Sequence, residues 1–237
     1  MLQHSDNWKK EYNRVKNYKH WDIFFGTNID MKECIIRHEF EELPKEFYGL
    51  INLQMLSINS RTFGKISSKI KCLKNLQIME IYYSRLTKCT NDVILKIPNN
   101  IGKLTNLKQL RITNKNVITI PKQIKYLTNL EVLRLQRNKI KTVPVEIKYL
   151  VKLQKLCLWM NEIKIIPKQI GKLVNLEFLS IQQNKLSDLP KQICRLSKLS
   201  SLDISKNGLM KVPKQIVNMK SLTFFIIDGT DIKNLRC

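Results

Sequence analysis

The stretch LEVLRLQRNKIKTVPVEIKYLVK, residues 130–152, decides the fold of this chain. It reads Leu-x-x-Leu-x-Leu-x-x-Asn-x-Ile-x-x-Val-Pro-x-x-Ile-x-x-Leu. The same pattern returns every 23 residues, as from position 107 to position 130, and it opens at Leu107, Leu130, Leu153, Leu176, Leu199 and Leu222. A fixed period of this length indicates a solenoid, because one such repeat cannot bury its own apolar face and needs stacked neighbours.

Each recurring position of the repeat pattern has a predicted physical role. Leu133 and Leu135 should point inward, and the residues between and beside them should point outward with a period of two. Asn138 should bond backbone groups that the following turn leaves unpaired. Pro144 should stand in the first turn of a short helix. Equivalent asparagines then predict a ladder of amides through Asn161, Asn184 and Asn207.

These residues resemble the leucine-rich repeat family, in the 23-residue form that carries Pro-x-x-Ile-x-x-Leu in its second half. The resemblance covers residues 30–237. It implies an α/β fold, a curved horseshoe-shaped solenoid with a parallel β-sheet on the concave face and short helical or 3-10 segments on the convex face. It also implies a recognition platform, since such repeats are mostly binding modules.

The organisation along the chain follows from where the repeat fits. Residues 1–29 lie outside it and are predicted to form a helical, aromatic N-terminal cap, with a short partner-binding helix as the alternative. Residues 30–52 form a degenerate repeat in which Ile35 should point inward, and the solenoid repeats continue from residue 53. A partial last repeat, residues 222–237, leaves the final coil half covered, which suggests end-to-end self-association.

Two departures interrupt the regular repeats. An insertion of eight residues, at about 87–96, lengthens the unit that opens at Leu76. Insertions in surface loops are tolerated at small entropic expense, so this one either carries binding or reflects neutral drift. In the next unit, Lys115 occupies the ladder position that asparagine holds elsewhere.

The chain is strongly basic, with 42 Lys and Arg against 19 Asp and Glu, a net charge of +23 and a pI near 9.9. Such a charge favours attraction to acidic surfaces. The simpler interpretation is a solvated outer face, since many of the lysines fall in the Pro-x-x-Ile-x-x-Leu half of the repeat. These are Lys122, Lys125, Lys148, Lys168, Lys172, Lys191 and Lys214.

The sequence predicts a cytoplasmic protein. Its first residues, MLQHSDNWKK, lack the apolar core of a signal peptide, and no apolar run approaches the length of a membrane span. The six cysteines are scattered and form none of the clusters that cap extracellular members of the family. Reduced thiols are therefore expected, and metal binding is not.

The sequence contains no constellation typical of catalysis or of cofactor binding, so we expect neither an enzyme nor a cofactor. The remaining signal lies at repeat positions 3, 5, 7 and 8, on the outward face of the strands. There a basic strip is expected beside two tyrosines and an exposed apolar patch, and Trp, Tyr and Arg are the residues most enriched at binding hot spots. The candidate partner-binding residues are Tyr82, Tyr83, Arg111, Arg134, Arg137, Trp159, Met160 and Phe178. Alternatively, Trp159 and Phe178 merely stack sideways on neighbouring strands.

The function that these features favour is a non-enzymatic protein–protein interaction scaffold, which grips a protein partner with an acidic surface on its concave strand face. One alternative is a basic protein that binds nucleic acid or another polyanion, although no known nucleic-acid motif is present. Another is the substrate-recognition part of a larger enzyme or effector. No membrane partner is expected.

Overall fold

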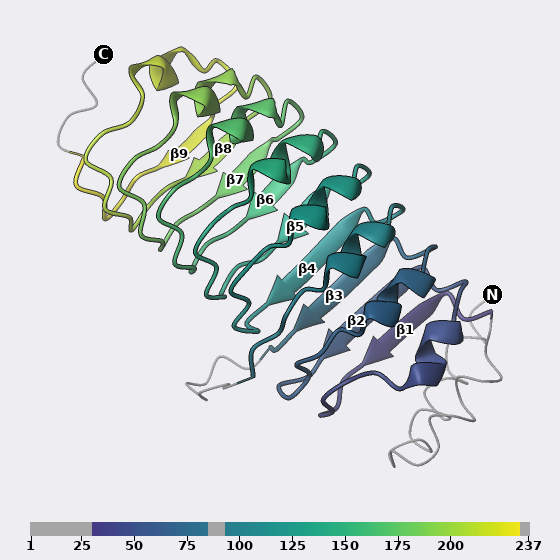
Figure 1. The fold of residues 1–237 in the computed structure, drawn as a ribbon. Helices are drawn as coiled ribbons and strands as arrows, with labels where there is room; N and C mark the ends of the chain where they lie inside the picture. The colour runs from purple at the N-terminus through teal and green to yellow at the C-terminus, as the bar shows by residue number, and fades with distance from the viewer. Residues whose placement is uncertain (1–29, 85–92, 233–237) are drawn as a thin grey trace, which may run out of the picture.

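A computed structural model describes residues 30–84 and 93–232 of the chain. Within these residues, nine strands form a single parallel sheet in chain order (Figure 1). The strands are β1 (Glu33–Ile36), β2 (Met55–Asn59), β3 (Ile78–Tyr82), β4 (Gln109–Thr113), β5 (Val132–Arg134), β6 (Lys155–Cys157), β7 (Phe178–Ser180), β8 (Ser201–Asp203) and β9 (Phe224–Ile226). Each strand pairs only with the strands of the coils before and after it, which confirms the predicted solenoid.

The register of the sheet follows the sequence period. Leu110, Leu133 and Leu156 are direct neighbours on adjacent strands, and each is at most 1% exposed. The outward residues beside them, such as Val132 and Arg134, are half-buried. The alternation of a strand therefore places one leucine row in the core and the candidate residues on the open face.

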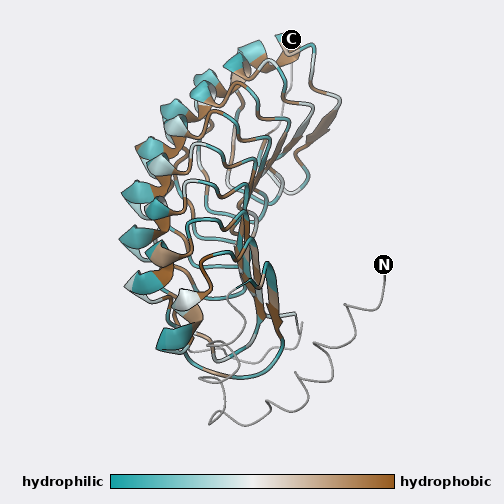
Figure 2. Ribbon diagram, turned by 90° about the vertical axis from the view of Figure 1, so that its right-hand side faces the viewer, coloured by the Kyte–Doolittle hydropathy of each residue, from teal (hydrophilic) through white to brown (hydrophobic). Residues whose placement is uncertain are grey.

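A five-residue 3-10 helix follows each of the first eight strands and completes the coil. The helices are η2 (Lys45–Gly49), η3 (Ser68–Cys72), η4 (Asn99–Lys103), η5 (Lys122–Tyr126), η6 (Val145–Tyr149), η7 (Lys168–Lys172), η8 (Lys191–Arg195) and η9 (Lys214–Asn218). Figure 2 shows these helices along the convex edge of the arc and the strands along the concave edge. The predicted horseshoe, with its sheet inside and short 3-10 segments outside, is confirmed.

The repeated proline stands one residue earlier than expected. Pro144 has φ −67° and ψ 146°, so it is extended and precedes η6 rather than forming its first turn. The proline ring still fixes φ, and the Pro144 carbonyl accepts the N–H of Ile147 at 3.0 Å. The residue thus marks where the extended segment turns into the 3-10 helix.

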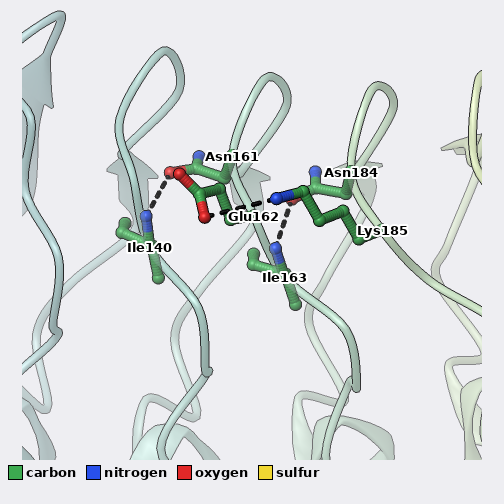
Figure 3. Close-up of polar contacts among 6 residues, drawn as sticks. All are labelled: Ile140, Asn161, Glu162, Ile163, Asn184 and Lys185. Atoms are coloured by element: carbon green, nitrogen blue, oxygen red, sulfur yellow. Dashed lines mark hydrogen bonds and ion pairs between the residues drawn. The ribbon is translucent and has the colours of Figure 1, made fainter.

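The predicted ladder of asparagine amides is present, and both the Nδ2 and the Oδ1 atoms of Asn161 and Asn184 form hydrogen bonds. Asn161 donates through Nδ2 to the carbonyls of Leu135 and Leu158, at 3.0 and 2.9 Å, and its Oδ1 accepts the N–H of Ile140 at 3.0 Å. Asn184 repeats this arrangement one coil later, where it accepts from Ile163 (Figure 3). Each asparagine therefore ties its own turn to the coil before it.

The first described coil corrects one prediction. Cys34 and Ile36 of β1 pair with Leu56 and Ile58 of β2, and both are buried, whereas Ile35 is half-exposed. The prediction that Ile35 points inward is therefore wrong. This coil is one residue shorter than the regular period, as positions 34 and 56 show, and a shift of one residue exchanges the two faces of a strand.

Lys115 fills its ladder position in an unexpected way. Its side chain is 0% exposed, and Nζ donates to the carbonyls of Ser60 and Arg61 at 3.0 Å each. The backbone N–H of Lys115 donates to Oδ1 of Asn138 at 3.1 Å, as the ladder requires. The lysine thereby reaches past the lengthened coil to the coil before it. Burial lowers its pKa to about 8, although attraction by Glu39 opposes the shift.

The final strand leaves an apolar edge. Phe224 and Ile226 of β9 are 66% and 41% exposed, whereas Ser201 and Asp203, the residues paired with them on β8, are half-buried. No described helix is both long enough and apolar enough to cross a membrane. The predictions for the N-terminal cap, for most of the insertion at 87–96 and for residues 233–237 lie outside the described residues.

Candidate partner-binding surface

The concave face carries the eight predicted residues on or just after five neighbouring strands, β3 to β7. Tyr82 ends β3, Arg111 lies within β4, Arg134 ends β5 and Phe178 begins β7. Strand pairing puts Arg111 directly beside Arg134. The remaining four follow the ends of strands β3, β5 and β6, at one edge of the sheet: Tyr83, Arg137, Trp159 and Met160. The strands thus gather seven of the eight residues, and Phe178 is set apart.

Arg111 is held between an aromatic ring and a carboxylate of the preceding strand. Its guanidinium carbon lies 4.3 Å from the centre of the Tyr82 ring, and Nη1 lies 3.9 Å from Oε1 of Glu80. Both interactions orient the guanidinium, and Glu80 neutralises part of its charge. Because β3 and β4 place Glu80 opposite Arg111, this ion pair could have been predicted from the register.

Arg137 and Trp159 form a second pair of an arginine and an aromatic ring. The guanidinium carbon of Arg137 lies 5.0 Å from the ring centre of Trp159, and its backbone N–H donates to the Trp159 carbonyl at 2.9 Å. The expected basic strip and aromatic patch are therefore interleaved rather than side by side. A guanidinium on an aromatic face keeps its donors directed outward at the edge of its plane.

The turn after each strand fixes the direction of these side chains. Arg137 and Met160 adopt left-handed conformations, with φ of 57° and 54°. In the coil of Arg137, the side-chain amide of Asn138 bonds the carbonyls of Leu135 and Gln136, at 3.0 and 3.3 Å, and so closes the turn around it. Left-handed backbone is unfavourable for such residues, so the buried amide ladder holds the exposed surface in place.

Arg134 has the Cys157 thiol of β6 as its neighbour. Burial raises the pKa of Cys157, and the charge and hydrogen bond of Arg134 lower it in part. The thiol is therefore neutral at physiological pH and is not an activated nucleophile. The position paired with Arg134 on β6 is thus occupied by this cysteine.

The three apolar residues do not form one contiguous patch. Phe178 is opposite Lys155 at the start of β6, whereas Trp159 and Met160 follow the end of that strand. Four residues along a strand correspond to about 13 Å, so Phe178 and Trp159 lie well apart. Met160 is 39% exposed, and Trp159 and Phe178 are half-buried. Trp159 is covered sideways by an arginine and not by Phe178.

Sequence reasoning missed two further features of this face. Nε of Arg111 and Oε1 of Gln136 are buried without a hydrogen-bond partner in the described part of the chain. Such atoms are uncommon, since a buried polar group without a partner is unfavourable.

Within residues 30–84 and 93–232, no three His, Cys, Asp or Glu side chains gather closely enough to hold a metal ion.

Comparison with known proteins agrees with the repeat and with the fold. The family model described as "Leucine-rich repeat region" matches residues 85–181 and 161–236. These matches together span more than half of the 237-residue chain. Among curated proteins, none matches the sequence.

Solved leucine-rich repeat structures are similar over most of the chain. A leucine-rich repeat protein of Leptospira interrogans is 31% identical, with a TM-score of 0.71, over 83% of this chain and 50% of that one. The plant peptide hormone receptor RGFR1, in complex with RGF2, is 25% identical, with a TM-score of 0.69, over 88% of this chain and 38% of the receptor.

A third structure is similar in fold alone. It is the ectodomain of the receptor kinase GASSHO1/SCHENGEN3 of Arabidopsis thaliana, in complex with CASPARIAN STRIP INTEGRITY FACTOR 2, at 23% identity and a TM-score of 0.74 over 86% of this chain and 25% of that one. The chain thus spans at most half the length of these three relatives. The stacked repeats, the family match and the Leptospira relative lead to one conclusion: the chain belongs to the leucine-rich repeat family.

Proposed function

We propose that this protein is a non-enzymatic interaction scaffold that binds a protein partner on its concave strand face. The observation that carries the proposal is the pair of arginine–aromatic contacts, Arg111 with Tyr82 and Arg137 with Trp159. Two relatives of similar fold, the plant receptors, are described in complex with the partners RGF2 and CASPARIAN STRIP INTEGRITY FACTOR 2. Peptide or protein recognition by such an arc supports the same role here.

Arg137, Trp159 and Met160 form the anchor of the proposed site. Guanidinium groups bind carboxylates through two parallel hydrogen bonds, so Arg134 and Arg137 would pair with acidic groups of the partner. Arg111 contributes less charge, because Glu80 already lies 3.9 Å from it. Tyr83 extends the surface toward β3, and Phe178 makes a separate apolar contact on β7. A partner with carboxylates around an apolar side chain fits this arrangement.

Replacing Trp159 with alanine should weaken partner binding by about 2 kcal/mol, roughly 30-fold in Kd, because the indole is both an apolar anchor and the support of Arg137. The measurement is isothermal calorimetry with a partner obtained by affinity capture on the wild-type chain. Ser201→Ala on β8, which removes one small side chain from the same face, is the matched control and should change Kd less than 3-fold. An unchanged Kd for the Trp159 variant would remove this residue from the site.

The exposed edge of β9 supports a second contact, with another copy of this chain. On one side β9 pairs with β8, and no described strand pairs with its other side. Phe224 and Ile226 would be covered when two such edges meet, and an apolar strand edge favours this kind of pairing.

Light scattering after size exclusion tests this self-association. We expect a concentration-dependent dimer for the wild type and a monomer for Phe224→Lys, whose charge would be placed within the paired edge. Met210→Lys changes a residue that is 75% exposed away from the strand edge, and it should leave the dimer intact. A wild-type chain that stays strictly monomeric at high concentration contradicts the proposal.

A reducing compartment such as the cytoplasm agrees with the state of the thiols. The four described cysteines are free: Cys34, Cys72, Cys157 and Cys194. Cys72 is exposed on the convex face, where an oxidising compartment would leave it open to oxidation or exchange. Burial raises the pKa of Cys34 to about 12, which makes that thiol unreactive.

A further inference from the structure

The convex face carries charge of almost one sign. The seven 3-10 helices from η3 to η9 contain one acidic residue, Glu146. Their eleven basic residues are Lys69, Lys71, Lys103, Lys122, Lys125, Lys148, Lys168, Lys172, Lys191, Arg195 and Lys214. Nine of these are exposed, and Lys125 and Lys148 are half-buried. Much of the net charge of the chain is therefore concentrated on one side of the arc.

The coils arrange these side chains in two rows that run along the outside of the arc. Successive helices stack in register, so equivalent residues follow one another from coil to coil (Figure 2). The first residues of helices η5 to η9 form one row: Lys122, Val145, Lys168, Lys191 and Lys214. The last residues of helices η4 to η8 form the other: Lys103, Tyr126, Tyr149, Lys172 and Arg195. The basic residues are thus aligned and not scattered.

Two exposed tyrosines interrupt the second row at neighbouring positions. Tyr126 and Tyr149 are 52% and 48% exposed. Nζ of Lys125 lies 5.0 Å from the centre of the Tyr126 ring, and Nζ of Lys148 lies at the same distance from that of Tyr149. Each ring therefore has an ammonium group beside it. The two lysine–tyrosine pairs occupy equivalent positions on successive coils.

The charge of the two rows is not neutralised within the described part of the chain. The ion pairs found there join Lys45 with Glu46, Lys65 with Glu42, Arg111 with Glu80, and Lys185 with Glu162. None of them involves the eleven basic residues of η3 to η9. Like charges aligned in this way repel one another and attract polyanions.

We propose that the convex face, from η4 to η9, binds single-stranded nucleic acid. The lysine rows would take the phosphates, and Tyr126 and Tyr149 would stack with bases. Aligned cations with interspersed aromatic rings are the features that proteins use for single strands without sequence preference. This surface is separate from the concave partner site, on the opposite side of the sheet (Figure 2).

The curvature of the arc favours a flexible strand over other polyanions. Duplex DNA has a persistence length of about 50 nm, so it stays nearly straight over the few coils of this arc and would contact a short part of it. A flat anionic bilayer would likewise contact the convex arc over a short length. A single strand can follow the outer surface and pair its phosphates with successive coils.

Fluorescence anisotropy with a labelled 20-nucleotide oligouridine tests the proposal on the whole chain. We expect binding that weakens with salt, with a slope of log K against log salt of about −4 for six phosphates contacted. A variant with Lys122, Lys168, Lys191 and Lys214 all changed to Gln should bind at least 10-fold more weakly. The matched control changes four exposed lysines outside the helices to Gln, and should lose less than 3-fold: Lys139, Lys141, Lys164 and Lys206.

A second variant examines the aromatic contribution. Changing Tyr126 and Tyr149 together to Ala keeps every charge and should weaken oligouridine binding about 10-fold, since base stacking on an aromatic ring contributes measurably to affinity. Circular dichroism of each variant confirms that it is folded. Equal losses for the convex and control lysine variants overturn the proposal, because net charge would then suffice. Equal or tighter binding of polyglutamate, a 20-base-pair duplex or phosphatidylserine vesicles overturns the assignment to single strands.

Discussion

Replacing Asn138 with alanine should lower the free energy of unfolding by about 3 kcal/mol, because its side-chain amide forms hydrogen bonds with several buried backbone groups at once. Nδ2 donates to the Ile112 carbonyl at 2.7 Å and to the Leu135 carbonyl at 3.0 Å. Oδ1 accepts the N–H groups of Lys115 and Val117, at 3.1 and 3.0 Å. Alanine would remove the partner that these four groups share, and of the four the Leu135 carbonyl would still accept from Asn161 at 3.0 Å.

Chemical denaturation followed by circular dichroism measures the loss. Lys139→Ala, at the exposed neighbouring position, is the control and should change the free energy of unfolding by less than about 0.5 kcal/mol. The slope against denaturant should be compared as well, because a solenoid can lose cooperativity when one coil is weakened. A loss below about 1 kcal/mol would show that the ladder amide is dispensable.

The second large effect concerns the pH dependence of stability, which should carry the signature of Lys115. Its pKa is lowered from 10.5 to about 8 in the folded chain by burial. Between these two values the unfolded chain binds more protons than the folded one, so the free energy of unfolding should rise with pH. The unfavourable burial of the charge is fully present below pH 8 and is relieved as the pH rises above it. The expected gain from pH 7 to pH 10 is on the order of 2 to 3 kcal/mol.

Lys115→Met isolates this contribution, since methionine keeps the apolar stem and cannot titrate. Other groups change protonation over the same range in both proteins, so the informative quantity is the difference in free energy of unfolding between the wild type and the variant. That difference should shift by on the order of 2 to 3 kcal/mol in favour of the wild type between pH 7 and pH 10. Parallel pH profiles would contradict the assignment of a lowered pKa to Lys115.

Much of the fold could be predicted from local sequence because one pattern recurs. Leu133 and Leu135 are buried and Asn138 bonds the turn, as their spacing predicts. The prediction failed where the period changes. The coil of β1 is one residue shorter, so Ile36 and not Ile35 enters the core. A single sequence fixes the register of a strand only where its repeat is regular.

Contacts between distant coils could not be predicted in the same way. The bonds from Lys115 to Ser60 and Arg61 join residues 55 and 54 positions apart, and they depend on the path of the lengthened coil between them. The alternation of each strand predicts that the candidate residues point outward from the core, and their half-buried or exposed state agrees with this. The contacts among them could not be predicted, because whether Arg137 lies on Trp159 depends on rotamers and on a left-handed turn.

The separation of Phe178 from Trp159 also could not be predicted from the repeat positions alone. Both occupy outward positions of adjacent repeats, so the repeat pattern alone predicts that they are neighbours. The register pairs Phe178 with Lys155 at the start of β6, whereas Trp159 follows the end of that strand. Position within the strand, and not position on the face alone, decides which residues share a contact.

The most direct test of the proposed concave site is affinity capture from cytosolic lysate at moderate salt, with and without nuclease treatment. The bait is either the wild-type chain or a variant with Arg134, Trp159 and Phe178 all changed to Ala, and the variant that lacks four convex lysines is the control. We expect a protein partner captured by the wild type and by the convex variant, and lost by the concave variant. Equal capture by the concave variant, or capture that disappears on nuclease treatment, would contradict a protein-binding site on the concave face.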